Sequence, residues 1–167
     1  MSDTRPAVYV ETSVVSYLAA RPSRDPVTRA RQELTRRWWS AAPTRYDRFA
    51  SAVVQRECDR GDPTYAAARA AIIASLPVLA GGEEADELGE RLVRAGLIPP
   101  KAAGDALHIA VATMNGMDFL ITWNFAHLAN GHVRRQVGRL VRSAGLEPPT
   151  IVTPQELGGG LDDDPAR

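Results

Sequence analysis

The chain has 167 residues, a length that suits one globular domain with a sizeable core. Its 20 basic and 20 acidic side chains cancel, so no whole-molecule field draws it onto nucleic acid, and any such contact must come from a local patch. One cysteine excludes an internal disulfide, and we see neither a signal peptide nor an apolar run long enough for a bilayer, which predicts a cytoplasmic protein with no membrane contact.

Strands and helices alternate along the chain. Residues 8–11 are typical of a short buried strand, and a helix follows at once, with Thr12 or Ser13 as its N-cap. Further strands are predicted at residues 48–52, 78–80, 117–122 and 150–153. Further helices are predicted at residues 26–39, around Glu57 as far as Gly61, and at 64–75, 85–95, 100–114 and 133–143. Gly96 is predicted to end the helix at 85–95, and Asn115-Gly116 the helix at 100–114.

This alternation, without hairpin turn signals, predicts an α/β fold with a central parallel sheet between two helical layers. Residues 1–157 are expected to form one domain. Residues 158–167 combine glycines with like charges, which predicts a disordered tail. In parallel α/β folds ligands bind beyond the carboxyl ends of the strands, so residues at strand ends are the ones to inspect.

Four oxygen-bearing side chains fall at or near such positions. Glu11 ends the first strand, and Asn124 lies two residues past the strand at 117–122. Asp105 lies near the start of the preceding helix, and Glu57 lies inside the helix after the second strand. Each acid taken singly is more often a helix cap, a surface charge or a salt-bridge partner, so their order and local context carry the interpretation.

Carboxylate and amide oxygens without clustered histidine or cysteine suit a hard cation such as Mg²⁺ or Mn²⁺ rather than zinc. A hard cation among acids activates water and offsets charge on phosphate oxygens, which is the chemistry of phosphodiester hydrolysis. Cys58 has no assigned base, so a thiol nucleophile is not expected.

Four segments carry these residues, in an order and context typical of one known family. They are Val8-Tyr-Val-Glu-Thr-Ser-Val-Val-Ser-Tyr-Leu18, Ser51-Ala-Val-Val-Gln-Arg-Glu57, Ala103-Gly-Asp-Ala-Leu-His-Ile-Ala110 and Asp118-Phe-Leu-Ile-Thr-Trp-Asn124. Over residues 8–157 the chain resembles the PIN-domain family, and within it the VapC-like toxins of bacterial toxin–antitoxin pairs. A single match is weak, whereas the ordered set is specific.

The resemblance implies a three-layer α/β/α fold and a metal-dependent endoribonuclease. It assigns the metal site to Glu11, Glu57, Asp105 and Asn124. It also implies that Thr12 or Ser13 holds a metal-bound water or a phosphate and that Thr122 makes a supporting hydrogen bond. The partners it implies are an RNA substrate, a cognate antitoxin that blocks the cleft, and a second copy of the chain in a homodimer.

Two positions depart from the family pattern, which commonly has Asp at both. Glu11 reaches one methylene further, and Asn124 would coordinate through a neutral carbonyl, which removes one negative charge. The expected result is weaker binding of a second metal.

Two histidines and one basic segment are open to two interpretations. His108, three residues after Asp105, is either a phosphate or proton-transfer group or, as we favour, a histidine packed against the next helix. His127 lies on a predicted loop, and the sequence favours neither a phosphate contact nor the absence of one. Between Arg24 and Arg48 lie five further arginines with Trp38 and Trp39, which favours either an RNA- or antitoxin-facing surface or an amphipathic helix with core tryptophans.

The sequence leaves three functions open. The first is a metal-dependent endoribonuclease, and the second is a PIN-fold module with weakened catalysis that acts through RNA or protein contacts. The third, a small-molecule phosphohydrolase, predicts a glycine-rich phosphate loop at the first strand–helix junction, and the sequence has none there.

Overall fold

The structure, a computed structural model, describes residues 4–158. Five parallel strands form one sheet in the order β3-β2-β1-β4-β5. The strands are β1 (Ala7–Val10), β2 (Asp47–Ser51), β3 (Val78–Leu79), β4 (Phe119–Ile121) and β5 (Thr150–Val152). The predicted parallel sheet between helices is confirmed.

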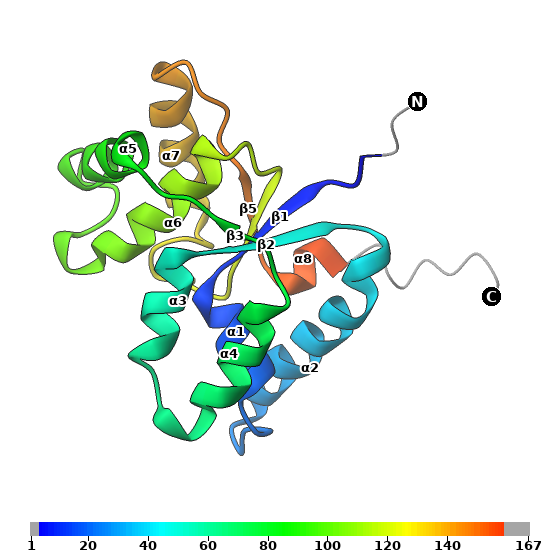
Figure 1. The fold of residues 1–167 in the computed structure, drawn as a ribbon. Coiled ribbons are helices and arrows are strands. Elements are labelled where there is room, and N and C mark those ends of the chain that lie inside the picture. Colours follow the sequence, from blue (N-terminus) through cyan, green and yellow to red (C-terminus); the bar gives the residue numbers. More distant parts are fainter. Residues whose placement is uncertain (1–3, 159–167) are drawn as a thin grey trace.

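Helices cover both faces of this sheet. The α-helices are α1 (Thr12–Ala19), α2 (Pro26–Ala41), α3 (Ala52–Asp59), α4 (Ala66–Ala74), α5 (Glu83–Arg94), α6 (Ala103–Met114), α7 (Gly131–Ser143) and α8 (Pro154–Gly158). Short 3-10 turns lie at Ala42–Thr44, Pro63–Tyr65 and Pro100–Ala102. Figure 1 shows α5, α6 and α7 on one side of the sheet and α1, α2, α4 and α8 on the other.

The strand order reverses at β1. From β1 the chain adds β2 and then β3 on one side, and later returns to the other side of β1 to add β4 and β5. Adjacent strands whose connections leave in opposite directions open a crevice beyond their carboxyl ends. By this rule the switch point lies beyond the ends of β1 and β4, and we call this position the crevice.

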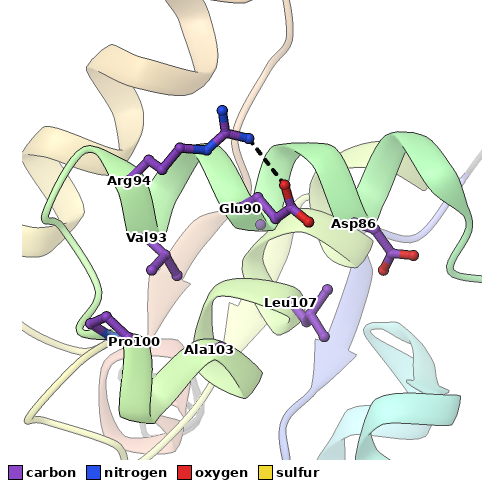
Figure 2. Close-up of a pocket in the computed structure, with 8 residues that line it drawn as sticks. Asp86, Glu90, Val93, Arg94, Pro100, Ala103 and Leu107 are labelled. Carbon is purple, nitrogen blue, oxygen red and sulfur yellow. Dashed lines mark hydrogen bonds and ion pairs between the residues drawn. The ribbon is translucent and has the colours of Figure 1, made fainter.

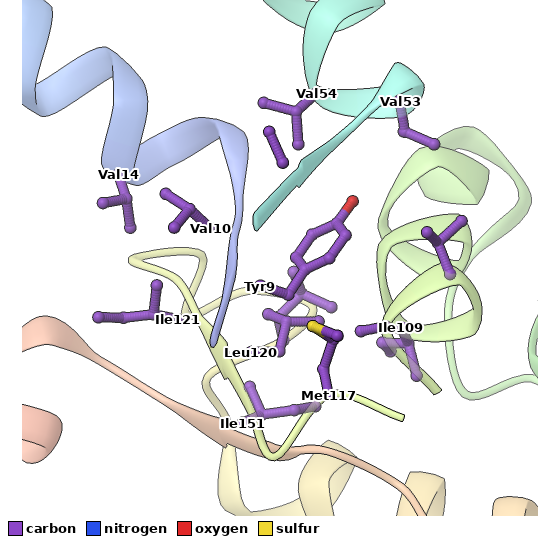
Figure 3. Packing of buried hydrophobic residues seen from close by; sticks show 14 of the residues in the cluster. Tyr9, Val10, Val14, Val53, Val54, Ile109, Met117, Leu120, Ile121 and Ile151 are labelled. Atoms are coloured by element: carbon purple, nitrogen blue, oxygen red, sulfur yellow. The ribbon is translucent and has the colours of Figure 1, made fainter. Parts of the chain in front are cut away.

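The apolar strand residues pack alternately into the two helical layers. Tyr9 and Leu120 point toward α6, whereas Val10 and Ile121 point toward Val14 of α1 (Figure 3). All five of these side chains have no exposed surface. A strand buried on both faces needs such a continuous apolar run, which is why the apolar runs of the sequence predicted β1 and β4.

Two glycines end helices at the predicted places. Gly96 after α5 has φ +75° and Gly116 after α6 has φ +64°. Glycine adopts this left-handed conformation at no steric cost, so each residue stops its helix and turns the chain.

The structure corrects the predicted N-cap of the first helix. The cap of α1 is Glu11, whose carboxylate accepts the backbone N–H of Ser13 at 3.0 Å, rather than Thr12 or Ser13. The hydroxyls of Thr12 and Ser13 donate to carboxylates instead, because an ionised oxygen is the stronger acceptor.

Helix α8 was not predicted, and it includes Gly158, which we had assigned to the tail. A capping box begins the helix: Glu156 accepts the N–H of Thr153 at 2.7 Å, and the Thr153 hydroxyl accepts the N–H of Glu156 at 3.1 Å. The Thr-x-x-Glu spacing is the signal that would have located it. The rest of the predicted tail, residues 159–167, lies outside the described residues. Within residues 4–158 no helix is both long and apolar enough to span a membrane.

Candidate metal centre

The crevice between β1 and β4 is lined by acids from three elements. Glu11 follows the last residue of β1, Glu57 lies on α3 and Asp105 lies in the first turn of α6. Asn124 follows the end of β4 by three residues. These four residues, separated by as many as 113 positions in sequence, share one edge of the sheet.

Glu11 is held rigidly through one carboxylate oxygen. Its Oε2 accepts the N–H of Ser13 at 3.0 Å, the hydroxyl of Thr122 at 2.7 Å and the hydroxyl of Ser13. The side chain is almost wholly buried. Its other oxygen, Oε1, lies 3.9 Å from Nε2 of His108 and accepts no hydrogen bond from the described residues.

Glu57 is held from two sides. Its Oε2 accepts a hydrogen bond from the hydroxyl of Thr12 and lies 2.9 Å from Nε2 of His108. Its Oε1 approaches α6 so closely that a Cβ at Gly104 would lie 2.8 Å away. Burial would raise the pKa of Glu57, but the hydrogen bond and charge of His108, with smaller contributions from Thr12 and Arg56, lower the pKa overall. Glu57 is therefore ionised at neutral pH.

His108 links the acids to the core through a chain of hydrogen bonds. The ring is fully buried, and its Nδ1 lies 2.7 Å from the Tyr9 hydroxyl, which lies 2.7 Å from the Ser51 hydroxyl. Burial alone would lower the pKa of His108, but Glu57, Glu11 and Asp105 raise the pKa overall. The structure buries the ring, as we favoured, but bonds it to β1 and α3, and our interpretation missed its contact with Glu57.

Asp105 and Asn124 form the other side of the crevice. Burial, and then the charge of Glu11, raise the pKa of Asp105, against a hydrogen bond from the Asn124 side chain. Asn124 Oδ1 accepts the backbone N–H of His127 at 3.1 Å, so the amide nitrogen is the atom that donates to Asp105. The His127 ring lies near enough to lower the pKa of Asp105 by its charge.

The Thr122 hydroxyl connects the end of β1 to the loop after β4 by hydrogen bonds. It donates to Glu11 and accepts the backbone N–H of Asn124 at 2.9 Å. Ser13 makes a second connection, because its hydroxyl accepts the backbone N–H of Trp123 at 2.8 Å. The loop after β4 is thus fixed to the start of α1.

The residues present fit a hard divalent cation. Ligand atoms of Glu11, Glu57 and His108 lie within 4.8 Å of one another, a group that does not include the Asp105 carboxylate. We regard His108 as an anchor rather than a ligand, because both ring nitrogens already face partners, Tyr9 and Glu57. The oxygens free to coordinate are carboxylate oxygens, which suit Mg²⁺ or Mn²⁺ better than zinc.

Two other features of the molecule lie outside this centre. A groove of about 570 Å³ between α5 and α6 is lined by Asp86, Gly89, Glu90, Val93, Arg94, Pro100, Ala103 and Leu107 (Figure 2). None of the four acidic-site residues lines this groove.

Cys58 is buried, and burial raises the pKa of its thiol to about 11, which fits an unreactive core cysteine.

The two tryptophans of the basic segment differ in burial. Trp38 is 1% exposed, and Trp39 is half-buried beneath the Arg48 guanidinium, 4.1 Å from its ring centre. Trp38 is therefore a core residue of an amphipathic helix, as our second interpretation had it.

Comparison with known proteins identifies the fold. No family model matches the chain, and no curated protein matches its sequence. VapBC2 from Rickettsia felis, solved bound to a DNA fragment from its promoter, aligns at a TM-score of 0.56 and 13% identity over 88% of this chain and 98% of that one. VapC20 of Mycobacterium tuberculosis, a toxin that cleaves the sarcin–ricin loop, aligns at 0.54 and 24% identity over 72% of this chain and 92% of that one. The resemblance to VapC-type PIN domains is confirmed at the level of the fold.

Proposed function

We propose that the chain is a metal-dependent endoribonuclease of the VapC toxin kind, which hydrolyses RNA phosphodiesters. One observation carries the proposal: the carboxylate that follows β1 and those of α3 and α6 converge at the switch point of a parallel sheet. Ligands bind at such points, and clustered carboxylates are the equipment for binding Mg²⁺ or Mn²⁺. The fold shared with an RNA-cleaving toxin points to the same substrate class.

In this proposal Glu11, Glu57 and Asp105 hold the cation, and Asn124 supports Asp105 through its amide. A bound Mg²⁺ or Mn²⁺ would supply Lewis acidity for water activation and offset charge on the phosphate. Ser13 and Thr122 orient Glu11, while Thr12 and His108 orient Glu57. His127, on the loop after β4, is the residue that we propose to contact a phosphate of the substrate.

The test is cleavage of a mixed RNA pool by the purified chain with Mg²⁺, with Mn²⁺ and with chelator. Asp105→Asn preserves shape and removes one charge, so we expect the metal-dependent rate to fall at least about 100-fold, since metal ions supply several kcal/mol of charge stabilisation. Asp118→Asn is the matched control, because Asp118 caps the N–H of Ala7 at the opposite edge of the sheet. Equal cleavage by the parent and by Asp105→Asn would refute the site.

A second candidate is a PIN-fold module that binds RNA or protein with weakened catalysis. One observation favours it: the fourth position offers a neutral amide oxygen in place of a carboxylate, and that oxygen already accepts the His127 N–H. Asn124→Asp would restore a carboxylate, and under the first proposal we expect it to keep or raise the cleavage rate. RNA binding without cleavage by both the parent and Asn124→Asp would move the binding module to first place.

The proposed partners follow from the VapBC2 likeness and from the sequence motifs. We propose a small cognate antitoxin that covers the crevice, and a homodimer of this chain. The gene next to this one identifies the candidate antitoxin, and co-purification with inhibition of cleavage would test it. Light scattering on the isolated chain would test the dimer.

A further inference from the structure

The loop after β4 runs from the acidic crevice to an exposed aromatic ring. Trp123 anchors this loop, because its indole N–H donates to the Thr35 hydroxyl at 2.7 Å inside the core. Asn124 then contributes to the crevice, and Phe125, the next residue, is 42% exposed. The Phe125 ring is therefore held one residue from the acidic site on a loop fixed at its other end.

An arginine lies against this ring. The Arg31 guanidinium carbon, on α2, is 4.8 Å from the Phe125 ring centre and 5.7 Å from that of Trp123. Among residues 4–158 no carboxylate pairs with Arg31 at salt-bridge distance, so its charge is not consumed by an ion pair. The ring and the guanidinium face a shared groove of about 400 Å³ between α2 and the loop. The groove is lined by Pro26, Val27, Ala30, Arg31, Leu34, Trp123, Phe125 and Gln155.

The surroundings of this groove are electropositive in a molecule with no net charge. Residues 21–31 hold four arginines and one acid, Asp25, for a local net charge of +3. Arg24 and Arg29 are exposed on this segment. We expect RNA to reach the acidic crevice through the cation bound there. The arginines of residues 21–31 would attract the phosphates of the same RNA.

We propose that Phe125 and Arg31 form a stacking subsite for one base of single-stranded RNA, next to the scissile phosphate. The inference rests on the proposed nuclease function and names its substrate form. Unpaired bases are recognised by stacking on aromatic rings and guanidinium planes, which duplex bases do not offer. Apart from Arg31, Gln155 is the lining residue with a polar side chain, so the subsite accepts any base with little sequence preference.

The arrangement favours RNA over a protein partner for two reasons. Phe125 of the groove follows Asn124 of the acidic site directly in one loop, so we expect one nucleic acid strand to reach both. The charge beside it is positive, which complements phosphates. A protein partner remains the competing outcome of the test.

The experiment measures RNA binding in the Asp105→Asn background, where cleavage does not interfere. A fluorescently labelled single-stranded RNA is titrated with Mg²⁺ present, and anisotropy gives the Kd. Phe125→Leu keeps an apolar side chain and removes the ring, so we expect binding to weaken about 5-fold or more, at the lower end of measured stacking effects. Phe125→Trp should restore the parent affinity, and Val78→Ala, at an exposed valine outside the groove, should not change it.

Two further arms separate stacking from charge. An RNA of the same length with abasic nucleotides should bind the parent and Phe125→Leu equally, because it has no base to stack. Arg31→Gln should weaken binding to both RNAs and reduce the slope of log affinity against log salt by about 1.

Unchanged affinity for intact RNA in Phe125→Leu would overturn the subsite. If the chain with Asp105 intact still cleaves RNA, the proposed function survives that result, and the groove passes to a protein partner. Failure of the chain to bind or cleave RNA at all would instead remove the proposed function and the subsite with it.

Discussion

Gly104 lacks a side chain at the place where α6 passes the Glu57 carboxylate. A Cβ there would lie 2.8 Å from Glu57 Oε1, a distance that real contacts do not show. Oε1 ends a flexible side chain, so the fold survives Gly104→Ala while Glu57 swings away from Thr12 and His108. We expect metal-dependent cleavage to fall about 10-fold or more, in the range for disturbed metal support, measured as initial rates.

Thermal unfolding of Gly104→Ala tests whether the loss is local. Alanine favours helix over glycine by about 1 kcal/mol, so the variant should be as stable as the parent. Gly131→Ala in the first turn of α7 is the matched control, because its Cβ would meet no atom within 4 Å. Full activity in Gly104→Ala would show that Glu57 does not need its observed position.

The Tyr9 hydroxyl contacts the site indirectly, through His108, which in turn contacts Glu57. Tyr9→Phe removes one oxygen and leaves His108 Nδ1 and the Ser51 hydroxyl without their shared partner in the core. A buried polar group left unpaired costs about 1–3 kcal/mol, and we expect that loss in the free energy of unfolding by urea. Tyr17→Phe is the control, since within residues 4–158 the Tyr17 hydroxyl makes no hydrogen bond, while its ring contacts Trp123. Its change should stay within about 0.5 kcal/mol, and equal losses in both variants would contradict the link.

Among the elements, α3 depends on a buried arginine from α4. Arg69 is 4% exposed, and it donates to the carbonyls of Cys58 and Asp62 at the carboxyl end of α3. A cation at this end of a helix also meets the negative pole of its dipole. Arg69→Met should therefore loosen the helix that carries Glu57.

We expect Arg69→Met to lower the free energy of unfolding by about 2–3 kcal/mol, as for hydrogen bonds that involve a charged group. Arg94→Met is the matched control, because Arg94 pairs with Glu90 on the exposed surface of α5. Its cost should be under about 0.5 kcal/mol. Equal urea midpoints for the two variants would show that Arg69 does not fix α3.

The elements also show how far sequence alone reaches. Continuous apolar runs predicted β1 and β4, and Gly96 and Gly116 predicted two helix ends, because these signals are local. Helix α8 was missed, although its Thr-x-x-Glu cap is equally local. Local sequence patterns were therefore sufficient to predict the alternation of strands and helices along the chain.

In the candidate site, too, local patterns predicted the residues, whereas the contacts between them depend on tertiary packing. Motif order and the strand-end rule predicted Glu11, Glu57, Asp105 and Asn124 from the sequence alone. The structure brings these residues to one edge of the sheet. Their roles stay predictions. The bonds of His108 to Tyr9 and Glu57 depend on strand register and helix packing, which periodicity does not supply. The orientation of the Asn124 amide likewise depends on the turn that places the His127 N–H.

At the scale of the whole molecule, the neutral net charge hides a separation of charge. Carboxylates gather in the crevice, and arginines gather along residues 21–31. Crowded carboxylates repel one another, so the unliganded fold carries a cost that a bound cation would relieve. The stability of the chain should therefore depend on divalent metal.

The sign of this effect follows from Asp105. Burial and the charge of Glu11 raise the pKa of Asp105 in the folded chain, so its ionisation above that pKa favours unfolding. In chelator, Asp105→Asn should melt above the parent, because it removes this charge and keeps its shape. Asp118→Asn, at the far edge of the sheet, should melt like the parent.

Added metal should reverse the order. A cation at 100 times its Kd stabilises the folded chain by about 2.7 kcal/mol, which raises the parent Tm by about 5–10 °C. Asp105→Asn should show a much smaller rise, while Asp118→Asn should match the parent in calorimetric scans with Mg²⁺, Mn²⁺ or chelator. The same metal-induced rise in all three chains would place the cation elsewhere, since only one of them has lost a carboxylate from the crevice.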